Sequence, residues 1–595
     1  MSAKPEAITT DPAGEPAAIA AAWLEAFDQA MTAGDAAAAA NLFLAQGWWR
    51  DLLALTGDLR TREGRDRIGA GLAPALARQH PRGFCLQADR PVTLEQPDAD
   101  TAWVQGFCEF ETDTGRGRGF LRLMRDADGV WRAWTLGTAL ESLKGHEEAL
   151  GHRRPQGVVH GPQRDRENWA ERRAAAREFA DRDPRVLVIG AGQGGLTIAA
   201  RLGRLGVDTL VVEKNPRVGD NWRNRYHSLV LHDPVWYDHM PYLPFPPHWP
   251  VFTPKDKLAD WFEHYANALE LNIWTGSRIE SAEYDKTRER WAVQVRRCDG
   301  SLREMHPNHL VMATGISGLP LVPDIPGMDD FRGQVVHSSA HQGGEGWAGR
   351  KAVVVGTGNS GHDIAHEFHE HGADTTMVQR SSTYVISSEN GIPTLFGGLY
   401  EEGGPPTEDA DLMFASLPYP LLAELHKGLT QQVAEMDREL LDGLESAGFK
   451  LDFGEDGSGL FMKYLRRGGG YYIDVGCSRL IAEGAISVKQ GAGIEAFTET
   501  GLRLDDGSHL EADIVVLATG YTNMRERARA LLGDDVADRA RPVWGLDDEG
   551  ELRTIWRESG HPGLWFMGGN LHQSRHYSKF LALQIKAREE GIALG

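Results

Sequence analysis

The chain has 595 residues, of which 41% are hydrophobic and 25% are charged, so it is long enough for three or four folded domains. Its formal net charge of −22 at pH 7 argues against nucleic acid and anionic membranes as partners, because both require a positive protein surface. The N-terminus lacks the apolar core of a signal peptide, and no apolar stretch of about 18 residues is present to span a membrane. The sequence therefore predicts a cytoplasmic protein that does not bind membranes.

The cysteine content argues against metal and dithiol chemistry. The four cysteines, Cys85, Cys108, Cys298 and Cys477, are far apart and form neither a C-x-x-C motif nor a metal-ligand spacing. We therefore expect no metal site and no redox-active cysteine pair.

The first part of the chain has its own pattern. Residues 1–16 are small and polar and predict a disordered tail. Residues 17–144 predict an α+β domain: helices at 19–32 and 36–44, the cluster Trp48-Trp49-Arg50-Asp51, and then alternating segments typical of a curved antiparallel sheet. This block resembles the SnoaL-like cone fold. The Trp48–Asp51 cluster either lines a ligand pocket or serves packing and assembly, and the sequence leaves both readings open.

Two glycine-rich loops follow in the rest of the chain. Each comes after a short apolar strand and opens a helix, and their glycines are Gly190, Gly192 and Gly195 in the first and Gly356, Gly358 and Gly361 in the second. Glycines let backbone N–H groups approach a pyrophosphate at a helix N-terminus, where the helix dipole favours anions. We therefore expect two dinucleotide sites.

The residue that ends the strand after each loop distinguishes the two nucleotides. Glu213 ends the first and Arg380, followed by Ser381, ends the second. A carboxylate at this place accepts hydrogen bonds from a ribose diol, whereas an arginine pairs with a 2′-phosphate. The sequence thus predicts FAD in the first half and NADPH in the second.

An internal repeat divides the chain. Both halves later carry a hairpin around Asp-Gly (Asp299-Gly300, Asp506-Gly507) and an apolar strand that ends in Ala-Thr-Gly at 313–315 and 518–520. We predict an α/β protein with two Rossmann-like domains: a linker at 145–183 with a helix at 167–179, an FAD-binding domain at 184–345 completed by 521–595, and an NADPH-binding domain at 346–520. The last holds a helical insertion at about 400–470, a candidate lid with one long helix at 421–446.

Several stretches together resemble the flavin-containing monooxygenases, the class that includes the YUCCA enzymes and, more distantly, Baeyer–Villiger monooxygenases. They are the two glycine loops, the segment Val218 to Tyr226, both Ala-Thr-Gly strands, and Phe331 to His337, which matches the family's F-x-G-x-x-x-H fingerprint. The resemblance covers about residues 184–595. It implies further cofactor-binding residues, namely Trp222, Arg223, Ala313, Thr314, Asn359, Ser360 and Gly520.

Two departures concern the subtype and the flavin edge. The fingerprint ends in His341 where the family carries Tyr, Phe or Trp, so the subtype is not readable from it. His232 stands where animal-type members carry an asparagine near the flavin, which is closer to the YUCCA-like pattern. The resemblance places His232 and Asn570 near the flavin as candidate catalytic residues. The aromatic, proline-rich segment 236–261 either forms a substrate wall or packs on the FAD domain.

The resemblance implies an NADPH-dependent flavin monooxygenase. Such an enzyme forms a C4a-hydroperoxyflavin and transfers one oxygen atom of O₂ to a small organic substrate, by N- or S-oxygenation or by a YUCCA-like oxidation. Baeyer–Villiger oxidation is an alternative, and a disulfide reductase is disfavoured by the missing cysteine pair. From another class, a non-catalytic NADPH-sensing flavoprotein with a ligand-binding SnoaL-like domain stays open, as does homodimer formation.

Overall fold

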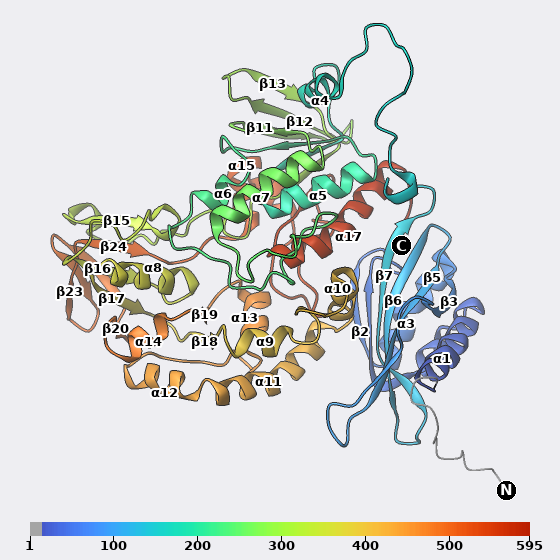
Figure 1. The fold of residues 1–595 in the computed structure, drawn as a ribbon, viewed down its shortest axis with the longest axis horizontal. Helices are drawn as coiled ribbons and strands as arrows, with labels where there is room; N and C mark the ends of the chain where they lie inside the picture. Colours follow the sequence, from blue (N-terminus) through green and yellow to red (C-terminus); the bar gives the residue numbers. More distant parts are fainter. Residues whose placement is uncertain (1–14) are drawn as a thin grey trace.

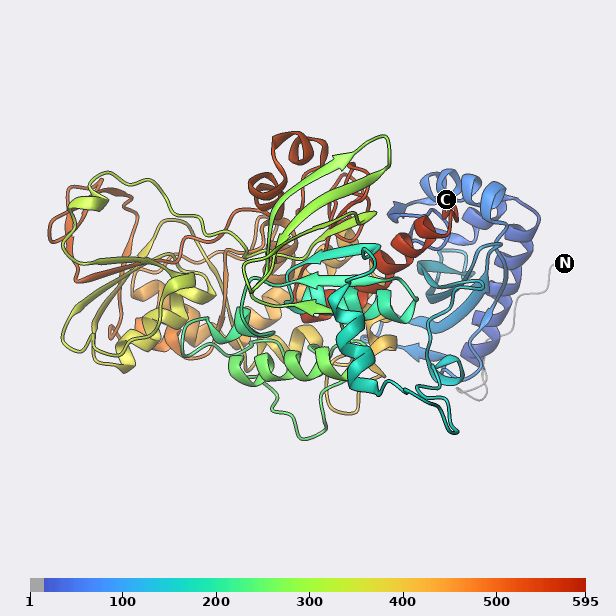
Figure 2. The ribbon, with the colours of Figure 1, turned by 90° about the horizontal axis from the view of Figure 1, so that it is seen from above.

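The computed structural model describes residues 15–595, so residues 1–14 of the predicted tail lie outside the described part. Figure 1 shows the N-terminal sheet at one end of an elongated molecule, one Rossmann-like sheet in the middle and a second at the other end. The long last helix, α17 (Leu571–Glu589), runs from the middle of the molecule to the N-terminal sheet, as both views show (Figures 1 and 2).

The N-terminal unit is a seven-stranded sheet with three helices. Its main path runs β2-β1-β7-β6-β5-β3, with β4 paired to β5. The strands are β1 (Phe43–Leu52), β2 (Leu59–Glu63), β3 (Arg82–Leu86), β4 (Thr93–Glu95), β5 (Trp103–Glu111), β6 (Gly115–Arg125) and β7 (Trp131–Leu143). The helices are α1 (Glu15–Thr32), α2 (Ala36–Asn41) and α3 (Arg65–Gln79). The alternating segments pair antiparallel, as predicted, but β1 and β7 pair in parallel, so the whole sheet is mixed. The second helix ends at Asn41, earlier than predicted, because β1 begins two residues later.

The linker contains a short 3-10 turn, η1 (Gly151–Arg153), and one helix, α4 (Trp169–Glu178). The helix begins two residues later than predicted because Asn168 caps it: the Asn168 side chain accepts from the N–H of Glu171, and the Glu171 carboxylate accepts from the N–H of Asn168.

The middle of the molecule is a five-stranded parallel sheet in the order β10-β9-β8-β14-β25. Its strands are β8 (Val186–Ile189), β9 (Thr209–Val212), β10 (Ile273–Trp274), β14 (His309–Met312) and β25 (Leu564–Phe566). Its helices are α5 (Gln193–Arg204), α6 (Asp220–Arg223), α7 (Lys255–Ala268) and α17. Two more helices, α15 (Met524–Leu532) and α16 (Asp534–Arg539), come before β25 in the chain. A three-stranded antiparallel sheet, β11 (Arg278–Asp285), β12 (Arg290–Arg296) and β13 (Leu302–Met305), holds the predicted Asp299-Gly300 turn.

The second parallel sheet repeats this plan in the order β15-β24-β16-β17-β20. Its strands are β15 (Gln334–His337), β16 (Lys351–Val355), β17 (Asp374–Gln379), β20 (Ser487–Gln490) and β24 (Ile514–Leu517). Helix α8 (Asn359–Glu370) follows the glycine loop, and α14 (Cys477–Ala482) and the 3-10 turns η2 (Met328–Asp330) and η3 (Ser338–Ala340) complete the set. The antiparallel strands β21 (Ile494–Thr498), β22 (Gly501–Leu504) and β23 (His509–Glu511) repeat the hairpin. The predicted α/β class with two Rossmann-like units is confirmed.

The insertion is helical, as predicted, but its long helix is broken. It consists of α9 (Gly391–Phe396), α10 (Thr407–Ala415), α11 (Tyr419–Met436), α12 (Arg438–Ser446) and α13 (Gly459–Arg467), flanked by the parallel pair β18 (Tyr384–Ser387) and β19 (Tyr471–Asp474). The predicted helix at 421–446 is interrupted at Asp437, whose carboxylate accepts hydrogen bonds from Ser387 and Asn390 at the end of β18.

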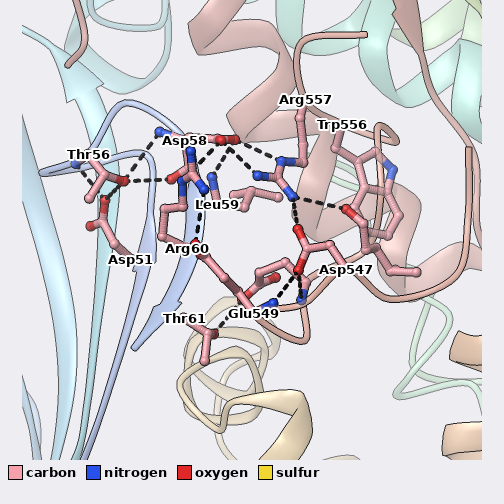
Figure 3. Close-up of polar contacts among 12 residues, drawn as sticks. Asp51, Thr56, Asp58, Leu59, Arg60, Thr61, Asp547, Glu549, Trp556 and Arg557 are labelled. Carbon is pink, nitrogen blue, oxygen red and sulfur yellow. Dashed lines mark hydrogen bonds and ion pairs between the residues drawn. The ribbon is translucent and has the colours of Figure 1, made fainter. Parts of the chain in front are cut away.

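The N-terminal sheet is docked tightly onto the rest of the molecule. Figure 3 shows Arg557, which precedes β25, bound through two nitrogens to the carboxylate of Asp58 at 2.8 and 2.7 Å and through a third contact to Asp547 at 3.0 Å. Arg50 of the Trp48–Asp51 cluster is buried against Glu551 at 2.7 Å, whereas Asp51 bonds within its own sheet, to Thr138 and Thr56. These contacts favour the packing role of the cluster. No helix of the described residues is long and apolar enough to cross a membrane.

Candidate cofactor and active site

A cavity of about 590 Å³ lies along the carboxyl edge of the middle sheet. Its lining begins beyond β9 with Glu213, passes the glycine loop after β8 and the 313–318 turn after β14, and ends with Gly569 and Asn570 after β25. β9 and β25 are three strand spacings apart, or about 14 Å at the usual spacing. The cavity therefore has the elongated shape that a dinucleotide requires at this edge of an open α/β sheet.

The first glycine loop leaves room for phosphate at the start of α5. Gly190 has φ of +106°, a conformation that favours glycine, and a Cβ there would lie 2.6 Å from the Ala313 carbonyl oxygen. A Cβ on Gly195 would lie 1.9 Å from the Gly190 carbonyl oxygen, so the loop can only fold back on the helix without one. No side chain caps α5 at Gly192, which leaves its first N–H groups free for an anion.

Glu213 is held beside this loop. Its two carboxylate oxygens accept from the backbone N–H of Ala191 at 2.7 Å and of Asn215 at 2.8 Å, and the residue is only 6% exposed. The carboxylate still lines the cavity. Since each carboxylate oxygen has two acceptor sites, the free lone pairs can take the hydroxyls of a ribose.

A second cavity, of about 960 Å³, lies along the carboxyl edge of the other sheet. The second glycine loop has the same geometry: Gly356 has φ of +115°, and a Cβ on Gly361 would lie 2.2 Å from the Gly356 carbonyl oxygen. Helix α8 likewise has no side-chain cap at Gly358. The lining includes the ends of β16, β17 and β24, with Arg380, Ser381 and Gly520 among the residues predicted from the sequence.

The end of β17 gathers cations and hydroxyls. Arg380 is exposed to the cavity and forms no salt bridge within residues 15–595. The insertion adds Lys463 of α13 to the same wall, 2.5 Å from the carboxylate of Asp452, which also accepts from the N–H of Gly454 at 2.8 Å. These hydrogen bonds, opposed by burial, lower the pKa of Asp452. The sequence did not single out Lys463, because the insertion carries no motif that marks it.

The two cavities adjoin. Ile316, Ser317 and Tyr521 line both of them. Helix α13 also faces both, with Lys463 in the second cavity and Tyr464 in the first. A nicotinamide in one cavity and a flavin in the other can therefore meet at these shared residues.

Three buried polar atoms at the first cavity have no hydrogen-bond partner among residues 15–595. They are Thr314 Oγ1, Trp222 Nε1 and Arg225 Nε, all on residues that line the cavity. An unpaired buried polar atom is costly, so a polar ligand in this place supplies what the protein leaves out. Together with the two open helix N-termini, these atoms show that the residues fit a dinucleotide.

Some predicted residues lie outside the two linings. Arg223 is taken up by Asp220 and Asp260 at 2.8 Å each, and Arg225 lines the first cavity in its place. Among the loop residues, Gly195 and Gly361 pack against backbone, and Asn359 accepts from the N–H of Ile473 at 2.9 Å. Ser360 lies near the Tyr226 hydroxyl, which donates to Asp363 at 2.7 Å. Trp222, Ala313, Thr314 and Gly520 line the cavities as expected.

The two candidate catalytic residues differ in position. Asn570 lines the first cavity, caps α17 by accepting from the N–H of Gln573 at 2.9 Å, and donates to the Tyr237 hydroxyl at 3.4 Å. His232 is absent from both linings and lies 3.8 Å from the carboxylate of Asp363 on α8. Direct contact of His232 with the flavin is therefore not supported by this geometry.

A carboxyl group and tyrosines surround Asn570 and were missed by the sequence reasoning. The Tyr464 hydroxyl accepts from the N–H of Asn570 at 3.2 Å and donates to Gln573 at 2.6 Å. Asp233 bonds the Asn570 amide, and burial raises the pKa of Asp233 to about 6, although His232 and Asn570 act in the opposite direction. The available signal for Asp233 was a carboxylate two residues after the apolar stretch at 229–231, next to His232.

The two fingerprint histidines contact the second parallel sheet and its helix α8. His337 Nδ1 accepts from the N–H of Ser339 at 3.1 Å and its Nε2 donates to the Gly520 carbonyl at 3.0 Å. His341 is buried 3.7 Å from the Glu367 carboxylate and packs on Phe368. His337 thus fixes the end of β15 by hydrogen bonds, whereas His341 is held mainly by packing beside Glu367.

Comparisons with known proteins agree with this site. The family described as pyridine nucleotide-disulphide oxidoreductase matches residues 187–390. The indole-3-pyruvate monooxygenase YUCCA1 of Oryza sativa subsp. japonica is 33% identical over 344 residues, which is 57% of this chain and 77% of that protein. The probable indole-3-pyruvate monooxygenase YUCCA9 of Arabidopsis thaliana is 33% identical over 338 residues, 56% of this chain and 74% of that protein.

The chain belongs to the flavin monooxygenase family. A crystal structure of cyclohexanone monooxygenase in the open state shares the fold, with a TM-score of 0.51 and 17% identity over 69% of this chain and 88% of that one. This flavin monooxygenase is an oxidoreductase that uses FAD and NADPH and acts with O₂ on a small organic substrate. The four cysteines are free and line neither cavity.

Proposed function

We propose that the chain is a monooxygenase in which the first cavity holds FAD and the second holds NADPH. The observation that carries the proposal is the pair of uncapped glycine-loop helices that open onto two adjoining cavities. Glu213 would accept from the ribose diol of FAD, and Arg380 with Ser381 would bind the 2′-phosphate of NADPH. When bound, the flavin supplies the chemistry: it takes a hydride from NADPH and activates O₂ for transfer of one oxygen atom to the substrate.

The residues of the protein bind the two cofactors, set the relative position of their rings and shield the site from water. The free N–H groups of α5 and α8 neutralise the two pyrophosphates, and the shared residues Ile316, Ser317 and Tyr521 set where the two ring systems meet. Lys463 provides a second cation beside Arg380 once the phosphate displaces Asp452. Tyr464, from the insertion, covers the first cavity next to Asn570 and so limits the access of water to this end.

The substrate would bind beside Asn570, where Asp233, Tyr237 and Tyr464 gather. A YUCCA-like oxidation of a 2-oxo acid is the first substrate class to test, because the matched relatives are named indole-3-pyruvate monooxygenases. We further propose that the protein is cytoplasmic. No helix of the described residues could span a membrane, and the net charge of −22 does not favour binding to an anionic membrane.

The test is rapid mixing of the FAD-loaded protein with NADPH, then with O₂, followed by the flavin absorbance, and product analysis with labelled O₂. We expect rapid reduction by NADPH and incorporation of one labelled atom into the product from a 2-oxo acid. Oxygen inserted next to a ketone would instead identify a Baeyer–Villiger enzyme. Reduction without any oxygenated product from a broad substrate panel would contradict the monooxygenase proposal and favour an NADPH-sensing flavoprotein.

A further inference from the structure

Helix α10 of the insertion is held at both ends by arginines of the N-terminal sheet. At its first turn, the carboxylate of Asp409 is 2.5 Å from Arg90 and 2.7 Å from Arg118, and its side chain is only 3% exposed. At its last turn, Arg50 donates to the carbonyl of Ala415 at 2.8 Å and Arg122 to the carbonyl of Met413 at 3.0 Å. Both sets follow the helix dipole, with a carboxylate at the first turn and cations at the last carbonyls.

The contact at the last turn is also close-packed. Arg122 donates to the Ser416 hydroxyl at 2.7 Å, and a Cβ on Gly137 of β7 would lie 2.6 Å from the Ser416 Cβ. Arg122 is 6% exposed, and its hydrogen-bond acceptors are neutral oxygen atoms. The sheet therefore meets α10 without space for water between Gly137 and Ser416.

The opposite side of α10 holds the helix that starts at the flavin cavity. Asp411 forms a two-bond ion pair with Arg575 of α17, at 2.6 and 2.8 Å, and also accepts from the Tyr400 hydroxyl at 2.9 Å. Although burial opposes ionisation, Arg575 holds the pKa of Asp411 below its ordinary value. The contact is thus a fully buried charge pair, which is costly to break on one side only.

Arg575 extends this contact to the residues beside Asn570. Its Nη1 donates to the carbonyls of Tyr237 at 2.7 Å and His239 at 2.6 Å. The Tyr237 ring stacks on His572 of α17 with centroids 4.4 Å apart, and its hydroxyl accepts from Asn570 at 3.4 Å. An unbroken series of buried contacts therefore runs from the N-terminal sheet through α10 and Arg575 to the rim of the first cavity.

We propose that the N-terminal sheet is a positioning element of the flavin site, and that Arg122 acts on Tyr237 and Asn570 through α10, Asp411 and Arg575. The inference rests on the proposed flavin site. It assigns the face of the sheet that carries Arg50 and Arg122 to holding α10, and not to binding a separate small ligand. Since α10 contacts the sheet on one side and α17 on the other, loosening it releases the loop at 237–239 and the first turns of α17.

The experiment compares Arg122→Met with Arg132→Met in the full-length protein. Arg122→Met removes the hydrogen bonds from the sheet to Met413 and Ser416. It leaves no carboxylate without its cation, because the acceptors of Arg122 are neutral. Arg132 is the control, because it lies in the same sheet and, among the described residues, bonds only Asp126 and the Asn41 carbonyl. Hydrogen exchange measured by mass spectrometry reports each segment, and titration of the apoprotein with FAD reports the affinity of the cavity.

We expect Arg122→Met to speed exchange in peptides that cover 407–416, 236–241 and 570–577, and to weaken FAD binding by at least about fivefold, the lower end of couplings between sites. Arg132→Met should speed exchange only within the N-terminal sheet. If Arg122→Met does not fold, Asp411→Asn tests the next step and should loosen 236–241 and 570–577 while leaving the N-terminal sheet protected. Wild-type exchange at 236–241 in the folded variants, or equal effects of Arg132→Met there, would overturn the proposal. Failure of the wild-type protein to bind FAD would instead contradict the proposed function.

Discussion

Arg380→Ala should separate NADPH from NADH. Arg380 is exposed to the second cavity and forms no salt bridge within the described residues, so its removal strands no protein carboxylate. A hydrogen bond to a charged group contributes about 1.5–3 kcal/mol, and solvent exposure favours the lower half of that range. A loss of about 1.5–2 kcal/mol corresponds to a factor of about 10–30 in affinity. Lys463, still present on the same wall, keeps the residual binding above that of a neutral site.

The assay is steady-state oxidation of NADPH and NADH by the FAD-loaded protein, at low and high salt. We expect the KM for NADPH to rise about 10–30-fold and the KM for NADH to change less than about twofold, because NADH lacks the 2′-phosphate. The NADPH effect should shrink as salt screens the exposed charge. Arg332→Ala, a change of an exposed arginine paired with Glu499 outside both cavities, is the control. Equal increases for both nucleotides would refute the assignment of Arg380 to the phosphate.

Three further outcomes follow from the first cavity. Gly195→Ala should prevent FAD retention, since its Cβ would lie 1.9 Å from a carbonyl oxygen. The control, Gly203→Ala in the same helix, places its Cβ within 4 Å of no other atom and should raise the unfolding midpoint slightly. Comparable flavin content in the two purified variants would contradict the loop geometry. Glu213→Ala should weaken FAD binding to the apoprotein by about tenfold or more, because two backbone N–H groups and the ribose lose their acceptor, and an unchanged dissociation constant would exclude the ribose contact. Burial raises the pKa of Asp233 in the folded protein to about 6, above its value in the unfolded chain. Ionisation of Asp233 therefore lowers the free energy of unfolding as the pH rises from about 4 through 6. Asp233→Asn should therefore stabilise the protein against urea by about 1–2 kcal/mol at neutral pH and hardly at all near pH 4, and an equal gain at both pH values would argue against the raised pKa.

The fold followed from local signals wherever a short pattern fixes the backbone. The glycine loops, the Asp-Gly hairpins and the Ala-Thr-Gly strands predicted the two repeated sheets, since each pattern has one compatible turn geometry. The break in the helix at 421–446 had no such signal. It depends on Asp437 meeting Ser387 and Asn390, which are about fifty residues earlier in the chain, and helical periodicity carries no information on that contact.

The sequence predicted the site residues that stand at a fixed spacing from a glycine loop, but it did not predict those that the insertion contributes. Glu213 and Arg380 stand at fixed distances from a glycine loop, so their positions follow from the Rossmann plan. Tyr464 and Lys463 come from an inserted helix whose place depends on tertiary packing, and neither was anticipated. For Arg223 the motif predicted a cofactor contact, and in the structure its guanidinium pairs with Asp220, Asp260 and Glu263.

Helix α13 bears on how such an enzyme could be redesigned. Successive residues of one helix, Lys463 and Tyr464, face different cavities. A substitution at Lys463 meant to change the preferred nicotinamide cofactor would remove its ion pair with Asp452, which holds the helix that carries Tyr464 in the wall of the flavin cavity. Cofactor exchange and substrate scope are therefore not independent engineering targets in this protein, and libraries that vary 463 should vary 464 at the same time.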